Sequence, residues 1–185
     1  IVTTVLASYR GYDTLGETTV VFTAAIAVMM LLGRKKERES VAALLQRDDI
    51  NYIGAKMLIP YILLFALYVQ FHGDFGPGGG FQAGVMFAAA FVLHSLVRSL
   101  AETQQAISLK VIEILIPAGV LLYAGTGVYC MVKGGNFLEY NVLDAHNPVH
   151  GQHLGILLVE AGVGITVFSA ILALFFTFAL RGRPK

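Results

Sequence analysis

The sequence contains no tryptophan, a single cysteine and few charged residues. Because Cys130 has no second cysteine to pair with, an intramolecular disulfide and a cysteine-based metal or cluster site are excluded. We expect Cys130 to be a small buried side chain. Charged residues make up 14% of the 185 residues, against about 25% in soluble domains. The shortage of charge excludes an ordinary soluble domain.

Long apolar stretches take the place of the missing charge. Hydrophobic residues make up 56% of the chain, and the mean hydropathy is +0.71. Five stretches reach the roughly 20 residues that a membrane-crossing helix needs: residues 15–33, 52–71, 80–97, 111–132 and 154–180. The apolar residues 1–9 resemble the tail of a further helix, and no basic segment typical of a signal peptide precedes them. We predict an all-α, polytopic transmembrane helix bundle with five full spans plus part of a sixth at the N-terminus.

Basic residues gather on one side of this alternating topology. Only Arg10 and Lys133 of the 13 Lys and Arg residues fall on the opposite side. The positive-inside rule makes the basic side cytoplasmic, and the C-terminus lies there. Residues 36–51 place apolar side chains between charges, which predicts a short amphipathic helix on that surface. Pro60 and Pro117 lie inside spans and are expected to kink them.

Glu160 is the strongest candidate for a functional residue. It lies inside the last span, with no Lys or Arg within ten residues on either side. A buried carboxylate needs a partner, a cation or a proton. Small residues follow it, Ala161, Gly162 and Gly164, which would let another helix approach closely. We interpret Glu160 as a proton or cation site; the alternative is a protonated glutamic acid that is hydrogen-bonded at a helix interface.

Glu17 lies three residues after Thr14, near the start of the first full span. This spacing is typical of a capping box, in which each side chain binds a backbone N–H of the first turn. The alternative is a cation or proton ligand in the outer part of the membrane. The two roles are compatible, since a capping residue can also face a polar cavity.

A second group of candidates lies at the cytoplasmic side. Lys110 and Glu113 are three residues apart at the start of a predicted helix and so share a face. His94, near the end of the preceding helix, could meet them across the connecting loop. This group would be the inner part of a proton path, or else an interfacial ion pair beside a packing histidine.

A glycine-rich hairpin joins the spans 52–71 and 80–97 on the outer side. No strand precedes it and no Gly-Lys-Ser/Thr follows, so dinucleotide-binding and P-loop motifs are excluded. Glycines permit unusual backbone angles and close approach, and the turn leads into a helix N-terminus. The hairpin is therefore either a plain tight turn or the edge of an ion entrance. The residues concerned are Asp74, Pro77, Gly78, Gly79, Gly80 and Gln82.

The outer loop near residue 150 carries His146, His150 and His153. Because Pro148 interrupts the spacing and no fourth ligand is obvious, we expect a structured loop that caps the bundle and no metal site. The sequence shows no nucleophile–base pair and no basic, aromatic surface. We therefore expect neither an enzyme nor a nucleic-acid-binding protein.

Two blocks of the chain are distinctive, FHGDFGPGGGFQAGVMFAAAFVL and NPVHGQHLGILLVEAGVGITV. They resemble the MnhB family, the B subunits of the Mrp-type multisubunit Na⁺/H⁺ antiporters. The N-terminal block YRGYDTLGETTVVFTAAIAVMMLL resembles the C-terminal end of the large A subunit of the same complexes. On this basis the chain divides into a transmembrane segment at 1–33, a cytoplasmic amphipathic linker at 34–51 and an MnhB-like four-helix transmembrane domain at 52–185.

The resemblance implies a multi-pass subunit of the cell membrane, without catalytic activity or a cofactor of its own. Its partners would be the other Mrp-type subunits, namely A, C, D and smaller membrane subunits, together with Na⁺ (or K⁺) and H⁺. Glu17 and Glu160 match acidic positions of the family motifs and would help form the translocation path. Two alternatives stay open: a structural bridging subunit, or the equivalent ion-translocating subunit of a redox-driven membrane-bound hydrogenase-like complex.

Overall fold

The computed structural model of the chain describes residues 10–32, 49–73 and 76–180. Within these ranges, five helices are long and apolar enough to cross a membrane. They are α2 (Gly11–Leu32), α3 (Asp49–His72), α4 (Gly80–Val97), α6 (Leu109–Val132) and α7 (Pro148–Ala179). The predicted all-α bundle with five full spans is therefore confirmed. The predicted helix tail at 1–9, most of the linker and Asp74 lie outside the described residues.

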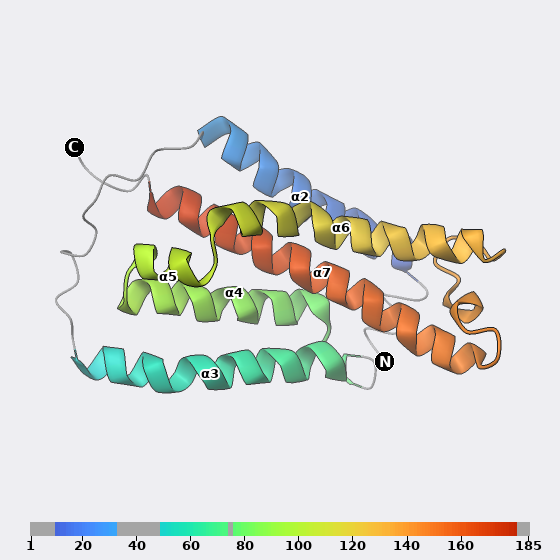
Figure 1. Cartoon of the computed structure of the whole chain (residues 1–185), viewed down its shortest axis with the longest axis horizontal. Coiled ribbons are helices and arrows are strands. Elements are labelled where there is room, and N and C mark those ends of the chain that lie inside the picture. Colours follow the sequence, from blue (N-terminus) through green and yellow to red (C-terminus); the bar gives the residue numbers. More distant parts are fainter. Residues whose placement is uncertain (1–9, 33–48, 74–75, 181–185) are drawn as a thin grey trace.

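Helix α7 is the central element of the bundle. It runs through the middle of the molecule, with α3 and α4 on one side and α2 and α6 on the other (Figure 1). In its most apolar stretch 67% of the residues are buried, against 11% to 33% in the other four spans. Polar groups on α7 are therefore the ones best shielded from lipid.

The start of α7 differs from its prediction. The span was expected to begin at residue 154, but the helix begins at Pro148. Asn147 is the N-cap, and its side-chain oxygen accepts a hydrogen bond from the backbone N–H of His150 at 3.2 Å. Proline is favoured in the first helical position because that N–H has no partner within the helix. Pro148 therefore starts the helix, and His150 lies in its first turn.

Two short helices were not predicted from the sequence. Helix α5 (Leu100–Ala106) joins α4 to α6, and the 3-10 helix η2 (Tyr140–Leu143) lies between α6 and α7. The Ser99 hydroxyl accepts the backbone N–H of Glu102 at 3.1 Å, which is the side-chain contact expected at a helix start. The connection between α4 and α6 is thus an ordered helical turn.

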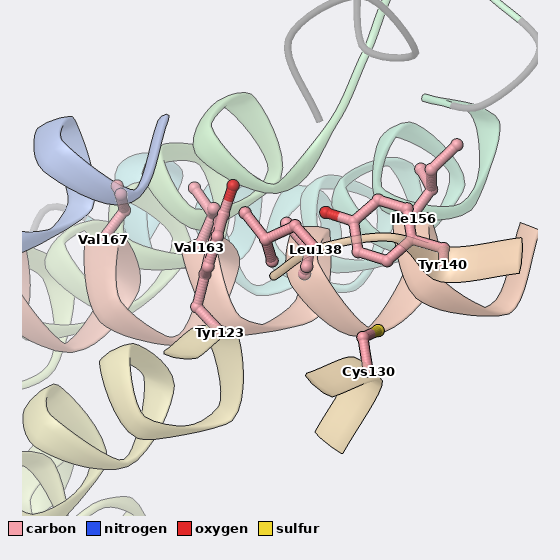
Figure 2. Packing of buried hydrophobic residues seen from close by; sticks show 8 residues of the cluster. Tyr123, Cys130, Leu138, Tyr140, Ile156, Val163 and Val167 are labelled. Carbon is pink, nitrogen blue, oxygen red and sulfur yellow. The ribbon is translucent and has the colours of Figure 1, made fainter. Parts of the chain in front are cut away.

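The segment between α6 and α7 folds back onto the bundle, as expected for a capping loop. Leu138 and Tyr140 from this segment are buried against Cys130 of α6 and Ile156 of α7 (Figure 2). Cys130 is fully buried, which confirms the prediction of a small core side chain. The loop therefore closes the end of the bundle at which α6 stops and α7 starts.

Candidate functional site

Glu160 lies on the inner helix α7 and is only 5% exposed. Its Oε2 accepts a hydrogen bond from the backbone N–H of Gly80, the first residue of α4. The N-terminal end of a helix carries partial positive charge and unpaired N–H groups, so it stabilises a carboxylate. The partner that the sequence did not reveal is a peptide group of another helix.

The hairpin between α3 and α4 positions this peptide group. Gly79 has a φ of 131°, a backbone conformation that side chains disfavour, and its N–H donates to the Val69 carbonyl at 3.2 Å. A Cβ on Gly80 would stand 2.9 Å from the carbonyl carbon of Glu160. The glycines thus make a tight turn and also let α4 begin directly against Glu160.

The other hairpin residues contribute less to this contact. Pro77 and Gln82 are exposed, and Gly78 is half-buried. Asp74, the remaining candidate in this stretch, lies outside the described residues.

Glycines also set the two helix crossings on either side of Glu160. A Cβ on Gly84 of α4 would stand 2.7 Å from the Gly164 carbonyl oxygen, and one on Gly119 of α6 would stand 2.5 Å from that of Gly162. Such backbone-to-backbone approach needs small residues on both helices. The prediction that Gly162 and Gly164 allow close packing of α7 is confirmed.

Tyr123 connects α6 with the start of α2. Its hydroxyl is buried and donates a hydrogen bond to the Gly11 carbonyl at 2.8 Å. Tyr123 of α6 therefore ties the first turn of α2 to the bundle.

The capping role predicted for Thr14 and Glu17 is wrong. Helix α2 already begins at Gly11, so Thr14 lies inside it, and its hydroxyl contacts the Arg10 carbonyl at 3.4 Å. A cap has to precede the helix whose N–H groups it binds. Glu17 is exposed on α2. Because a carboxylate inside a span cannot face hydrocarbon without a large cost, this face of α2 requires water or a neighbouring subunit.

The predicted inner candidates lie at the opposite end of the bundle. The Nδ1 atom of His94 lies 2.7 Å from the Thr103 hydroxyl, which itself donates to the Ser99 carbonyl at 3.0 Å. The Thr103 hydroxyl thus contacts both the His94 ring and the Ser99 carbonyl. His94 thus binds α5 within the α4–α6 connection, while Lys110 is exposed and Glu113 is half-buried on α6.

The histidine-rich loop before α7 is organised by Asp144. One carboxylate oxygen accepts the backbone N–H groups of His146 and Asn147 at 3.0 and 3.1 Å, and the other lies 2.9 Å from Nδ1 of His150. The hydrogen bond from His150, followed by those two N–H groups, lowers the pKa of the Asp144 carboxyl. Residues 10–32, 49–73 and 76–180 contain no cluster of three metal-ligating side chains.

A model for the family described as "Domain related to MnhB subunit of Na+/H+ antiporter" matches residues 50–173. The matched range includes the glycine hairpin and Glu160, and it covers more than half of the chain. The chain belongs to the MnhB family. In this MnhB chain, the contact between Gly80 and Glu160 joins the first and second of the two distinctive blocks of the sequence.

Curated relatives of the same family are similar over most of their own length. The antiporter subunit mnhB2 of Staphylococcus haemolyticus (strain JCSC1435) is 30% identical over 135 residues, which cover 68% of this chain and 95% of that protein. The mnhB2 protein of Staphylococcus aureus (strain Newman) is 31% identical with the same coverage. About a third of this chain therefore has no counterpart in these MnhB relatives.

Two solved structures resemble this MnhB chain in fold. The Mrp complex from Dietzia sp. DQ12-45-1b aligns with a TM-score of 0.74 and 25% identity, over 100% of this chain and 21% of that chain. The membrane-bound sulfane sulfur reductase (MBS), an archaeal respiratory membrane complex, aligns with a TM-score of 0.65 and 30% identity, over 94% of this chain and 76% of that one. The chain thus spans about a fifth of the Dietzia chain.

The N-terminal segment matches a second family. Residues 1–48 match a model for MbhE, described as a subunit of MBH, whereas the sequence blocks pointed to the end of the antiporter A subunit. The two family matches meet at residues 48–50, within the predicted linker. Helix α2 therefore belongs to a different family segment from the four MnhB spans.

Sequence reasoning missed three polar residues that the structure places near the candidate residues: Gln70 beside the hairpin, Tyr123 bonded to Gly11, and Thr103 in contact with His94. A usable signal existed for the first two, because an amide and a phenol inside apolar spans are unusual.

Proposed function

We propose that Glu160 and Glu17 line part of the cation or proton path of a Mrp-type multisubunit Na⁺(K⁺)/H⁺ antiporter, in which this chain is a membrane subunit. Family membership and the antiporter names of the relatives support the assignment to such a complex. The partners are then the other antiporter subunits. In this proposal the chain has no catalytic activity of its own, lies in the cell membrane and has its C-terminus in the cytoplasm.

The observation that carries the proposal is the setting of Glu160. The carboxylate is almost fully buried on the most enclosed helix and is held by the first N–H of α4. A hydrogen bond from a neutral peptide stabilises charge without cancelling it, unlike a salt bridge to Lys or Arg. Such a carboxylate can take up and release a proton or a monovalent cation.

The test is Glu160→Gln in the complete complex, purified and reconstituted in liposomes. Glutamine keeps the shape of the side chain and can still accept the Gly80 N–H, but it can neither ionise nor carry a proton. We expect Na⁺-dependent proton movement to fall by about tenfold or more, with unchanged subunit composition. Glu139→Gln is the matched control, because this carboxylate lies in the outer loop and accepts the Asn136 N–H at 2.7 Å.

Each alternative role predicts a different result. A purely structural bridging subunit would transport normally with Glu160→Gln, or would lose partner subunits. Normal transport by an intact Glu160→Gln complex refutes the proposal that Glu160 lines the cation or proton path.

A second candidate function is supported by two comparisons. Residues 1–48 match the MbhE family, and 94% of the chain aligns with an archaeal respiratory membrane complex. The same helices could then translocate ions in a redox-driven complex, with the electron-carrying groups on other subunits. Mass spectrometry of the proteins that co-purify in mild detergent separates the cases: antiporter subunits alone support the first, and iron–sulfur or nickel-binding subunits support the second.

A further inference from the structure

Gln70, near the end of α3, carries a buried amide nitrogen with no hydrogen-bond partner in the part of the chain that the structure describes. The residue as a whole is half-buried, but Nε2 itself is shielded. A buried donor without an acceptor destabilises the folded protein. Native proteins satisfy nearly all such groups, and an ordered water is a usual partner.

The amide lies at the crossing of α3, α4 and α7, next to the Glu160 site. Gln70 Oε1 stands 2.7 Å from the point that a Cβ on Gly164 would occupy, and the Gly80 carbonyl oxygen stands 3.3 Å from the same point. The N–H of that same Gly80 donates to the Glu160 carboxylate. Gln70, which lies against Gly164, and Glu160, which binds the N–H of Gly80, therefore both lie at the place where Gly80 of α4 meets Gly164 of α7.

The chemistry of the amide selects the class of ligand. The oxygen and nitrogen of a glutamine side chain can exchange places by a flip, and the hydrogen-bond network decides between the two orientations. In one orientation the group without a partner is a donor, and in the other it is an acceptor. Water serves both, whereas a bare cation could bind only the oxygen. A water molecule is therefore the ligand that fits either orientation.

We propose that Gln70 is a positioning residue that holds a water molecule against Glu160, and that this water exchanges protons with the carboxylate. A hydronium ion at this place passes one proton to the Glu160 carboxylate and leaves water and a neutral carboxylic acid; the reverse step returns the proton. The inference rests on the proposed function, since it supplies the proton donor for the same site. It adds α3 to the helices that build the path.

The experiment replaces Gln70 by methionine in the reconstituted complex. Methionine has a similar length and no donor or acceptor of comparable strength, so it keeps the packing and loses the water. We expect Na⁺-dependent proton movement to fall by about tenfold or more, with normal assembly. Gln105→Met is the control, because it makes the same substitution at an exposed position of α5.

An infrared difference spectrum adds a readout that a packing defect would not move. The carboxyl band of Glu160, identified by its loss in Glu160→Gln, should shift to higher frequency in Gln70→Met, because the neutral acid loses a hydrogen bond. Normal transport and an unshifted band in Gln70→Met, with Glu160→Gln inactive, overturn this inference alone. Normal transport by Glu160→Gln overturns the proposed function instead.

Should Gln70→Met fail to assemble, cryo-electron microscopy of the wild-type complex decides. Water density within about 3 Å of both the amide and the carboxylate supports the proposal. A protein side chain in that place, or a direct bond between Gln70 and Glu160, refutes it.

Discussion

Substituting Gly80 by alanine tests whether the start of α4 is built against Glu160. The new methyl group would stand 2.9 Å from the carbonyl carbon of Glu160 and 2.9 Å from the backbone nitrogen of Gly164, with the Glu160 carbonyl oxygen closer still. These are backbone atoms of α7, so no side-chain rotation relieves the clash. The first turn of α4 has to move away from α7.

Two costs add in this variant. Overpacking a tight site costs about 1–3 kcal/mol, and losing a hydrogen bond to a charged group costs about 1.5–3 kcal/mol. Together they give roughly 2.5–6 kcal/mol, which for a chain of this size corresponds to a fall of about 5–25 °C in melting temperature. Transport should fall as well, because the N–H that holds Glu160 moves with α4.

The assay is the apparent melting temperature of the purified complex, followed by size-exclusion chromatography after heating. Gly54→Ala and Gly125→Ala are matched controls, because a Cβ at either position meets nothing within 4 Å in this chain. Their melting temperatures should stay near the wild-type value or rise slightly, since alanine favours helix by about 0.5–1 kcal/mol over glycine. A Gly80→Ala complex as stable as these controls refutes the described α4–α7 contact.

Two further predictions concern Tyr123 and Asp144. Tyr123→Phe removes the 2.8 Å hydrogen bond to the Gly11 carbonyl and should destabilise the docking of α2 by about 1 kcal/mol, measured as faster hydrogen exchange in α2 and not in α4. The pKa of Asp144 is lowered in the folded loop. The Asp144 carboxylate therefore stabilises the loop fully at any pH above the pKa of an unfolded aspartate, and this stabilisation is lost as the pH falls through the lower pKa of the folded loop. Exchange protection of residues 144–150 should therefore collapse in acid in the wild type, whereas Asp144→Asn should lack this protection already at neutral pH; equal protection in both proteins contradicts this role.

The spans were predictable because the membrane imposes a length and an apolar composition on each crossing helix, and both are visible in the sequence. The errors lie at the ends, where single residues decide. Pro148 was read as an interruption, but beside the capping Asn147 it starts α7. Thr14 and Glu17 were read as a cap, but α2 begins at Gly11. The Ser99–Glu102 spacing that begins α5 was overlooked.

The sequence was enough to identify Glu160 as a candidate residue, but not to predict which groups it contacts. Glu160 was conspicuous because it lies in an apolar span with no basic residue near it in the sequence, and the structure shows that it is buried. Its partner is the N–H of a residue that lies 80 positions earlier, and the phenol beside it reaches Gly11 across 112 positions. The sequence can mark a glycine or a tyrosine in an apolar span as unusual, but which partner it contacts is decided only when the helices pack.

The joining of two family segments in one chain has a consequence for the relatives. The Staphylococcus mnhB2 proteins align over 95% of their length with 68% of this chain, and the family match for the MnhB part begins at residue 50. Helix α2 lies before that point, yet it supplies Glu17 and the carbonyl that binds Tyr123. A buried phenol without an acceptor is costly. We therefore expect relatives that retain this tyrosine to receive the equivalent of α2 from a neighbouring subunit, so that the surface between α2 and α6, internal here, is an interface between subunits there.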